Sequence, residues 1–266
     1  MGRKTTINTE PTEPGIINIQ DVIDFCFCPK FAKLKNNNTT LLTEYNKALY
    51  NTYYSFLHTL IKTSDSNKLE DAFERLKVSW GKEWIKENDF KSIQILPINP
   101  NVDTYSKRRR MGIDTITNFY KLITLYEQYP ITINKQYKLK IDNFYICGNI
   151  DYIREVKINN QKRIQAVKIL PEETRHCAYI EDRKGLDTIA MYFGFKQMFD
   201  IDFDLILLDP NKNKMNKVIR TEKQYNMLVD ACRYYKHCKD NNIYFISPDS
   251  KCGICEYKNK CFPESR

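Results

Sequence analysis

The segment 148–170 places an acid and a lysine in two apolar, strand-like runs. Asp151 lies in the run 149–153, and Lys168 lies in the run 164–170. The residues between these runs are polar turn formers, so we expect a β-hairpin with the two runs as adjacent strands. An ionisable side chain among apolar neighbours costs desolvation energy unless it is paired. An acid and a lysine on neighbouring strands therefore indicate a shared site.

Such a pair suits a nuclease that depends on a divalent metal. Asp151 would hold Mg²⁺ or Mn²⁺, and Lys168 would steady the attacking water or the charge of the phosphate. A second acid is expected two residues before the lysine, because alternate residues lie on one face of a strand. Ala166 occupies that position, and a methyl group cannot bind a metal. The expected site is therefore nearly complete but lacks one acid.

Three cysteines near the C-terminus have the spacing of metal ligands. Cys252 and Cys255 form a CxxC pair, and Cys261 follows after five more residues. This segment is rich in lysine and lacks an apolar pattern, so soft-metal ligands are a better interpretation than core cysteines. A fourth ligand must come from elsewhere, and the candidates are Cys28, Cys26 and Cys238. Cys238 would complete a local zinc site, whereas Cys28 would join the two ends of the chain and favour a 4Fe–4S cluster.

Composition indicates a globular protein with a polyanionic partner. The 266 residues are 42% hydrophobic and 28% charged, and the net charge is +9. This basic balance favours a polyanionic partner. No apolar run has the length of a membrane span and no secretory signal is present, so we expect a cytoplasmic protein without a membrane partner. Nine cysteines, an odd number, then favour metal or cluster binding over a disulfide framework.

Hydrophobic periodicity predicts a mixed α/β fold with a helical insertion. Residues 1–16 are expected to be a mobile tail, followed by one domain over 17–266. This domain would comprise a mainly helical region 17–129, an α/β core 130–239 and a cysteine-rich segment 240–266. Helices are predicted over 18–27, from Pro29, and over 44–61, 69–86, 104–129, 185–198 and 221–235. Strands are predicted over 131–141, 144–156, 163–170 and 203–208.

A basic cluster is predicted at the start of the helix 104–129. It consists of Lys107, Arg108, Arg109 and Arg110. Such a run is either a solvated helix end or a contact to a nucleic-acid backbone. The net positive charge of the chain favours the second interpretation.

The chain resembles the CRISPR-associated Cas-four exonucleases and the RecB and AddB nuclease domains of the PD-(D/E)XK superfamily. The motifs behind this resemblance are Cys28-Pro29, Gly148-Asn-Ile-Asp151, the strand with Lys168 and the terminal CxxC-x5-C. The resemblance implies a mixed sheet flanked by helices and metal-dependent cleavage of single-stranded DNA or DNA ends. It also implies a 4Fe–4S cluster on four cysteines, which would be Cys28, Cys252, Cys255 and Cys261. Partners in recombination, replication or CRISPR adaptation would follow.

Several positions depart from the pattern of this family. Besides Ala166, Tyr50 falls where the family has a histidine, although His58 lies further along the same helix. Asp187 falls where the family has a glutamine, five residues before the aromatic Tyr192. Asp187 is therefore a candidate for the missing carboxylate.

These departures leave alternatives open. Another register would use Asp142 with Glu155 and Lys157 as the metal-binding set.

Three functions are also open. The chain is a nuclease that lacks one acid, a natural pseudonuclease that serves as a DNA-binding or assembly subunit, or a zinc-stapled α/β adaptor without nucleic acid.

Overall fold

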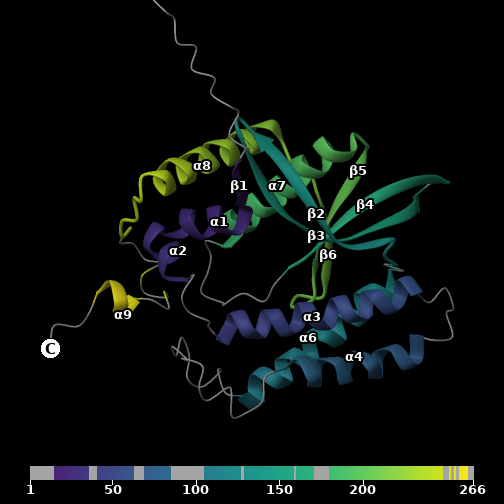
Figure 1. Ribbon diagram of the computed structural model, residues 1–266. Coiled ribbons are helices and arrows are strands. Elements are labelled where there is room, and N and C mark those ends of the chain that lie inside the picture. The colour runs from purple at the N-terminus through teal and green to yellow at the C-terminus, as the bar shows by residue number, and fades with distance from the viewer. Residues whose placement is uncertain are drawn as a thin grey trace, which may run out of the picture.

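A computed structural model describes most of the chain (Figure 1). The described residues are 15–35, 41–62, 69–84, 105–126, 129–158, 160–170, 180–247 and 258–262, together with Cys252 and Cys255. The first part of the chain forms one strand and then helices: β1 (Gly15–Asn18), α1 (Ile19–Phe27), α2 (Pro29–Lys35), α3 (Leu41–Lys62), α4 (Leu69–Glu83) and α6 (Tyr105–Leu125). The second part forms β2 (Thr132–Ile141), β3 (Phe144–Ile158), β4 (Gln161–Ile169), α7 (Ile180–Phe199), β5 (Phe203–Asp209), β6 (Lys214–Val218), α8 (Glu222–Asp240) and α9 (Lys258–Cys261).

Local capping residues set the ends of several helices. The side chain of Asn18 accepts a hydrogen bond from the Gln20 amide and caps α1. Cys28 is extended and Pro29 opens α2, because the residue before a proline avoids the helical region. Thr221 and Gln224 form a capping box at the start of α8.

The strands form one six-stranded mixed sheet. β2, β3 and β4 make an antiparallel meander, β5 returns parallel to β4 after α7, and β6 pairs antiparallel with β5. β3 changes partner along its length: it pairs with β1 as far as Cys147 and with β4 from Tyr152 onward. Residues 148–151 therefore lie between these two stretches of β3, where neither β1 nor β4 pairs with it.

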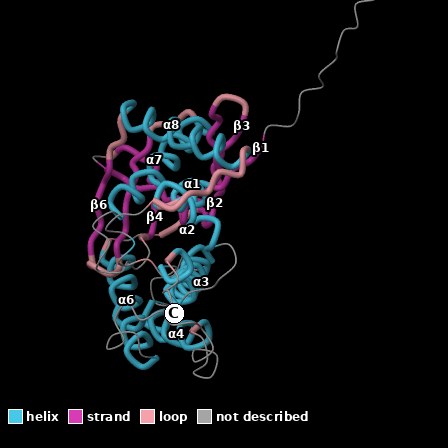
Figure 2. Tube along the Cα trace, turned by 90° about the vertical axis from the view of Figure 1, so that its left-hand side faces the viewer, coloured by secondary structure: helices cyan, strands magenta, loops and turns pink. Residues whose placement is uncertain are grey.

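Helices cover both faces of the sheet (Figures 1 and 2). One hydrophobic core lies between the sheet and the helices α1, α7 and α8, and it includes Ile153 and Ala166. The other core lies between the sheet and the helices α3, α4 and α6, and it includes Tyr152 and Val167. Because neighbouring residues of a strand point to opposite faces, adjacent positions of β3 and β4 enter different cores.

Segments from the two ends of the chain pack together. The Lys30 amide donates to the carbonyl of Phe245 at 3.2 Å, and the Phe25 ring lies 6.3 Å from the ring of Tyr244. The Lys33 ammonium lies over the Tyr244 ring at 5.0 Å. These contacts place α1 and α2 against the segment that leads to the C-terminal cysteines.

The mixed α/β class and the principal helices and strands agree with the sequence-based predictions, with differences at the ends. The predicted tail 1–16 is too long by two residues, because β1 begins at Gly15; residues 1–14 lie outside the described part. β1 and β6 were not predicted because both are short, and β6 is an edge strand with a largely polar sequence. The division into a helical region, a core and a cysteine-rich segment stays a prediction. None of the described helices is both long and apolar enough to cross a membrane.

Candidate functional site

Asp151 lies in the stretch of β3 that neither β1 nor β4 pairs with. Its Oδ2 accepts a hydrogen bond of 2.6 Å from the Ile169 amide on β4. The Ile169 carbonyl accepts one of 2.6 Å from the hydroxyl of Tyr50 on α3. The ladder between β3 and β4 ends at Tyr152 and Val167, so side chains here satisfy backbone groups that a continuing ladder would have bonded.

The second oxygen of Asp151 is also bonded. The hydroxyl of Tyr54 on α3 donates to Asp151 Oδ1 at 2.6 Å. Burial raises the pKa of the Tyr54 hydroxyl and the Asp151 charge raises it further, so Tyr54 stays protonated and remains a donor. Burial also raises the pKa of Asp151, while Lys168, Tyr54 and the Ile169 amide oppose that shift. Asp151 is thus a buried carboxylate that accepts on both oxygens.

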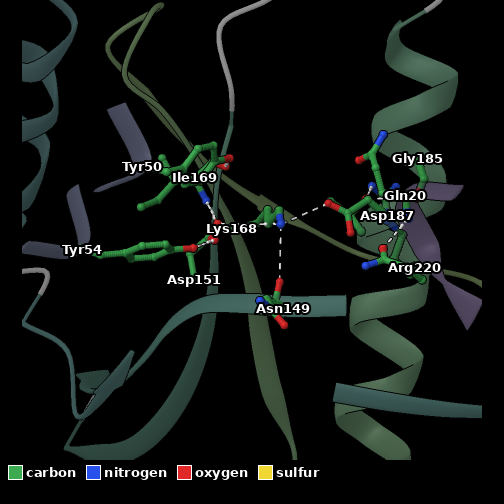
Figure 3. A network of polar contacts seen from close by, with 12 residues as sticks. Gln20, Tyr50, Tyr54, Asn149, Asp151, Lys168, Ile169, Gly185, Asp187 and Arg220 are labelled. Carbon is green, nitrogen blue, oxygen red and sulfur yellow. Dashed lines mark hydrogen bonds and ion pairs between the residues drawn. The ribbon is translucent and has the colours of Figure 1, made fainter. Parts of the chain in front are cut away.

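Lys168 lies between two carboxylates, as Figure 3 shows. Its Nζ is 3.9 Å from Asp151 Oδ2 and 3.2 Å from the Oδ2 of Asp187 on α7, and it donates to the Asn149 carbonyl at 3.4 Å. Burial lowers the pKa of Lys168, but the charges of Asp151 and Asp187 outweigh burial and leave it above its ordinary value. The network therefore holds a charged ammonium and reaches from α3 through the sheet to α7.

The position of the missing acid is filled by apolar packing. Ala166 is fully buried in the core that faces α1, α7 and α8. Asp187 is the second acid that the structure brings to Lys168, and its side chain is 21% exposed, against 2% for Asp151. Within the described residues, no three His, Cys, Asp or Glu side chains are grouped closely enough to hold a metal ion.

Tyr50, Asp151, Lys168 and Asp187 thus come together, whereas two other candidates do not join them. Tyr192 packs in an aromatic group, with its ring 5.1 Å from the rings of Phe193 and Phe203. His58 is exposed on α3, so it does not replace the family histidine that Tyr50 displaces.

The alternative register is not assembled. Asp142 lies in the turn before β3 and makes a bidentate ion pair with Arg233 of α8. Glu155 lies near the other end of β3, where it pairs with Lys162 at 3.0 Å, and Lys157 is exposed. The three residues of that register therefore do not form one site.

The four residues of the predicted basic cluster on α6 differ in their exposure to solvent. Arg108 is buried, and its guanidinium lies 5.3 Å from the centre of the Tyr45 ring. Lys107, Arg109 and Arg110 are exposed. Since a phosphate backbone reaches only exposed side chains, Arg108 belongs to the packing of the helical layer and the other three remain candidates for DNA contact.

Three of the four predicted cluster cysteines lie near one another: Cys28 and Cys252 are both close to Cys261. Burial raises the pKa of the Cys261 thiol, and Cys28 and Cys252 raise it further, while Lys30 opposes them. The Cys255 amide donates to the Cys252 carbonyl at 3.4 Å. These thiols come from both ends of the chain and are soft ligands, so their chemistry fits a cluster, although they are not as close as metal ligation requires.

The alternative fourth ligands lie apart from this group. Cys26 is exposed on α1, and Cys238 is buried on α8, within the core formed by α1, α7 and α8. Among the three candidates, Cys28 is the one that contributes to the raised pKa of the Cys261 thiol. The junction of the chain ends explains this, because α2 begins directly after Cys28.

Sequence reasoning missed two residues around the site. Tyr54 was not singled out because its role depends on a contact with a distant strand. Tyr137 on β2 is fully buried; a Cβ at Gly148 would overlap its hydroxyl, which explains the glycine of the Gly-x-x-Asp motif by packing.

Comparisons with known proteins add little to this geometry. No family model matches the chain, and no curated protein matches it. A crystal structure described as "Putative exonuclease" from Eubacterium rectale is similar over 96% of this chain and 99% of that chain, with 9% sequence identity and a TM-score of 0.41. Similarity at this level does not establish a shared fold. The class that the structure itself defines is a mixed α/β protein with helices on both faces of the sheet.

Proposed function

We propose that this chain is a DNA-binding protein on a PD-(D/E)XK nuclease-like fold whose carboxylate–lysine site has lost most or all of its cleavage activity. The observation behind this proposal is the state of Asp151: both of its oxygens accept hydrogen bonds from the protein. Ala166 supplies no second acid beside it. The convergence of Asp151 and Lys168 at the end of the β3–β4 ladder supports a nuclease ancestor, and the net charge of +9 supports a nucleic-acid partner.

The residues that would hold a divalent ion are Asp151 and Asp187. An ion there would polarise a phosphate oxygen and lower the pKa of a bound water. In the present arrangement the Lys168 ammonium lies near both carboxylates and neutralises part of their charge. An ion would also have to replace the hydrogen bond from Tyr54. These costs favour the pseudonuclease over an active nuclease.

Restoring the missing acid tests the proposal. Ala166→Asp and Ala166→Glu should raise Mn²⁺-dependent cleavage of single-stranded DNA above that of the unchanged chain, because a second carboxylate typically contributes orders of magnitude to such a rate. Cleavage is measured with an end-labelled oligonucleotide, and affinity is measured in parallel without metal. Adding Lys168→Ala to the restored variant should abolish the gain.

The two arms of this experiment separate the alternatives. DNA binding without cleavage in every variant would favour a binding or assembly subunit. Cleavage by the unchanged chain at the rate of the restored variant would contradict the loss of activity. A chain that does not bind DNA even at low salt would refute the proposal and leave the adaptor without nucleic acid.

The proposal includes a 4Fe–4S cluster on Cys28, Cys252, Cys255 and Cys261. Support comes from the packing of α2 against the C-terminal segment and from the nearness of Cys28 and Cys252 to Cys261, which contributes to the raised pKa of the Cys261 thiol. A cluster at this junction would crosslink the two ends of the chain. Zinc on the same thiols is the alternative, and the colour of the purified protein distinguishes them.

A further inference from the structure

The edge of the sheet at β6 carries exposed cations from three segments of the chain. Arg163 lies on β4, Lys212 lies in the turn between β5 and β6, and Lys214 and Lys217 lie on β6. All four side chains are exposed. Figure 2 shows β6 at the side of the sheet. We call these four residues the β6-edge cations.

One buried carboxylate holds two of these cations together. Lys217 Nζ lies 2.7 Å from Asp204 Oδ1, and Arg163 Nη1 lies 3.7 Å from the same oxygen. The side chains of Lys217 and Arg163 are 52% and 51% exposed, whereas that of Asp204 is 8% exposed. One carboxylate balances only one of the two cations, so this group presents a positive charge to solvent.

The strand register explains how these three side chains meet. Asp204 on β5 pairs with Gln165, which is two residues beyond Arg163 on β4. Lys217 pairs with Ile206, which is two residues beyond Asp204. Because alternate residues of a strand lie on one face, all three side chains share the same face of the sheet.

A second buried carboxylate positions Lys212. Asp209 Oδ1 accepts hydrogen bonds from the amides of Asn211 and Lys212, at 3.1 and 3.2 Å, and Asp209 Oδ2 lies 3.7 Å from Lys212 Nζ. The Lys212 side chain is 62% exposed and that of Asp209 is 9% exposed. The hydroxyl of Thr115 on α6 donates to Asn211 Oδ1 at 3.2 Å and fixes the turn further. The turn therefore directs its lysine to solvent from a fixed backbone.

This arrangement fits a chain of phosphates better than a single anion. Lys214 and Lys217 are three residues apart on one strand, which corresponds to about 10 Å at the rise of a β-strand. Lys212 extends this row beyond Lys214, and Arg163 lies beside Lys217. Cations at intervals along one edge can each contact a phosphate of a linear polyanion, which then releases the counterions that those phosphates had condensed.

The carboxylate–lysine site is less suited to a first contact with DNA. The Lys168 side chain is only 15% exposed and lies near two carboxylates. The β6-edge cations, in contrast, are exposed above carboxylates that are buried. They are also linked by the Thr115–Asn211 contact to α6, the helix that carries the exposed Arg109 and Arg110.

We propose that Arg163, Lys212, Lys214 and Lys217 bind a chain of phosphates along the β6 edge of the sheet. This inference rests on the proposed function for the identity of that chain, which is then the backbone of DNA. Lysines on an edge strand also hinder pairing with the edge of another sheet. The experiments below separate that protective role from phosphate binding.

The first test compares the double variant Lys214→Gln/Lys217→Gln with the matched control Lys47→Gln/Lys82→Gln. Lys47 and Lys82 are exposed on α3 and α4, and Lys47, like Lys217, lies near a carboxylate. Affinity for a single-stranded oligonucleotide is measured across a series of salt concentrations. Loss of two phosphate contacts should make the slope of log affinity against log salt shallower by about 1.4.

The control should keep the slope of the unchanged chain. Equal slopes in all three proteins would overturn the inference. Self-association of Lys214→Gln/Lys217→Gln with an unchanged slope would likewise overturn it, because that result would leave these lysines only the protective role.

The second test maps the contact on the unchanged chain and so does not depend on the folding of a variant. The lysines are modified with an amine-reactive reagent with and without the oligonucleotide, and the modified peptides are quantified by mass spectrometry. Bound DNA should protect Lys212, Lys214 and Lys217, whereas Lys47 and Lys82 should react equally in both samples. Unchanged reactivity of the three β6-edge lysines in the complex would contradict the inference.

Inorganic polyphosphate separates this inference from the proposed function, because it is a chain of phosphates without bases. If the chain does not bind DNA but polyphosphate protects Lys212, Lys214 and Lys217, the proposed function fails and the β6-edge surface stands. If DNA binds and protects none of the three, the surface fails and the proposed function stands. Binding of neither ligand would refute both.

Discussion

At the scale of single residues, Asp151 shows how a catalytic-looking carboxylate can have a structural task. β3 and β4 separate at this point, and Asp151 accepts the Ile169 amide that the ladder leaves unpaired. Tyr54 and Tyr50 complete the bonding from α3. Because a buried backbone amide without a partner is costly, this arrangement preserves Asp151 whether or not it binds a metal.

Tyr54→Phe removes the donor to Asp151 Oδ1 without changing the packed volume of the ring. Hydrogen bonds to charged groups contribute about 2 kcal/mol, so the free energy of unfolding should fall by about that amount. Urea unfolding measures the change. The control is Tyr192→Phe, since the Tyr192 hydroxyl makes no hydrogen bond to the described residues, and its effect should be much smaller. Equal effects of the two substitutions would contradict the role of Tyr54.

The pKa shifts of Asp151 and Asp142 have opposite directions, so they predict opposite dependences of stability on pH. Burial raises the pKa of Asp151 above 3.8, so its contribution is most favourable below that value and is lost as pH rises through the folded-state pKa. The hydrogen bond from Arg233 lowers the pKa of Asp142, so its contribution is present above 3.8 and is lost as pH falls through the lowered pKa.

The measurement is urea unfolding of Asp151→Asn and Asp142→Asn from pH 3 to pH 7. The stability of the unchanged chain relative to Asp151→Asn should decline as pH rises. Its stability relative to Asp142→Asn should increase over the same range. Parallel curves for the two variants would be inconsistent with these pKa shifts.

At the scale of elements, α7 packs closely against the sheet because residue 194 is a glycine, which has no side chain. Gly194 faces the ring of Tyr137 on β2, and a Cβ there would overlap that ring. The same helix covers the edge of β2, where the Lys138 amide contacts the sulfur of Met198 at 3.1 Å and the Lys140 amide donates to Gln197 at 2.8 Å. Close approach of α7 thus keeps Asp187 within reach of Lys168.

Gly194→Ala and Gly185→Ala form a matched pair on α7. Gly194→Ala should cost about 1–3 kcal/mol of stability, because the added methyl overpacks the contact with Tyr137. The nearest atom to a Cβ at Gly185 is Ile189 Cδ1 at 4.0 Å, so Gly185→Ala should stabilise the helix by about 0.5–1 kcal/mol. Thermal unfolding distinguishes the two, and a stable Gly194→Ala variant would contradict the packing of α7.

At the scale of the whole molecule, the fold joins segments that are distant in the sequence. α1 and α2 pack against the segment 243–247, which leads to Cys252 and Cys261. The carboxylate–lysine network similarly connects α3, β3, β4 and α7 (Figure 3). A cluster at the first junction would stabilise the whole chain, because it closes a very long loop.

Cys28→Ser and Cys26→Ser test this junction with a matched pair from the same region. The unchanged chain, purified without oxygen, should be brown, with bound iron and broad absorption near ~400 nm. Cys28→Ser should lose iron and thermal stability, whereas Cys26→Ser should keep both, since Cys26 is exposed on α1. Iron analysis and absorption spectra provide the measurement. A colourless chain with bound zinc would instead favour the zinc-stapled alternative.

The amino-acid sequence by itself determined the local features of this protein. Apolar periodicity predicted α3 and α4, strand-like apolar runs predicted β3 and β4, and flanking prolines and an N-cap threonine indicated α6 and α8, because each of these signals lies within or next to a single element. Polar residues within apolar runs pointed to Asp151 and Lys168, because desolvation is costly wherever the strand packs. The sequence also showed an alanine at position 166, where the pattern of the site requires an acid.

Only the tertiary structure decided which side chains meet. Arg108 looked like part of a basic surface, but the packing of α6 on α3 buries it. Tyr54 of α3 and Asp187 of α7 join Asp151 and Lys168 from two distant helices, and no periodicity within one element encodes such a contact. The physical reason is that strand pairing and helix docking depend on residues far apart in the chain, so the partners of a buried charge are fixed only when the layers pack.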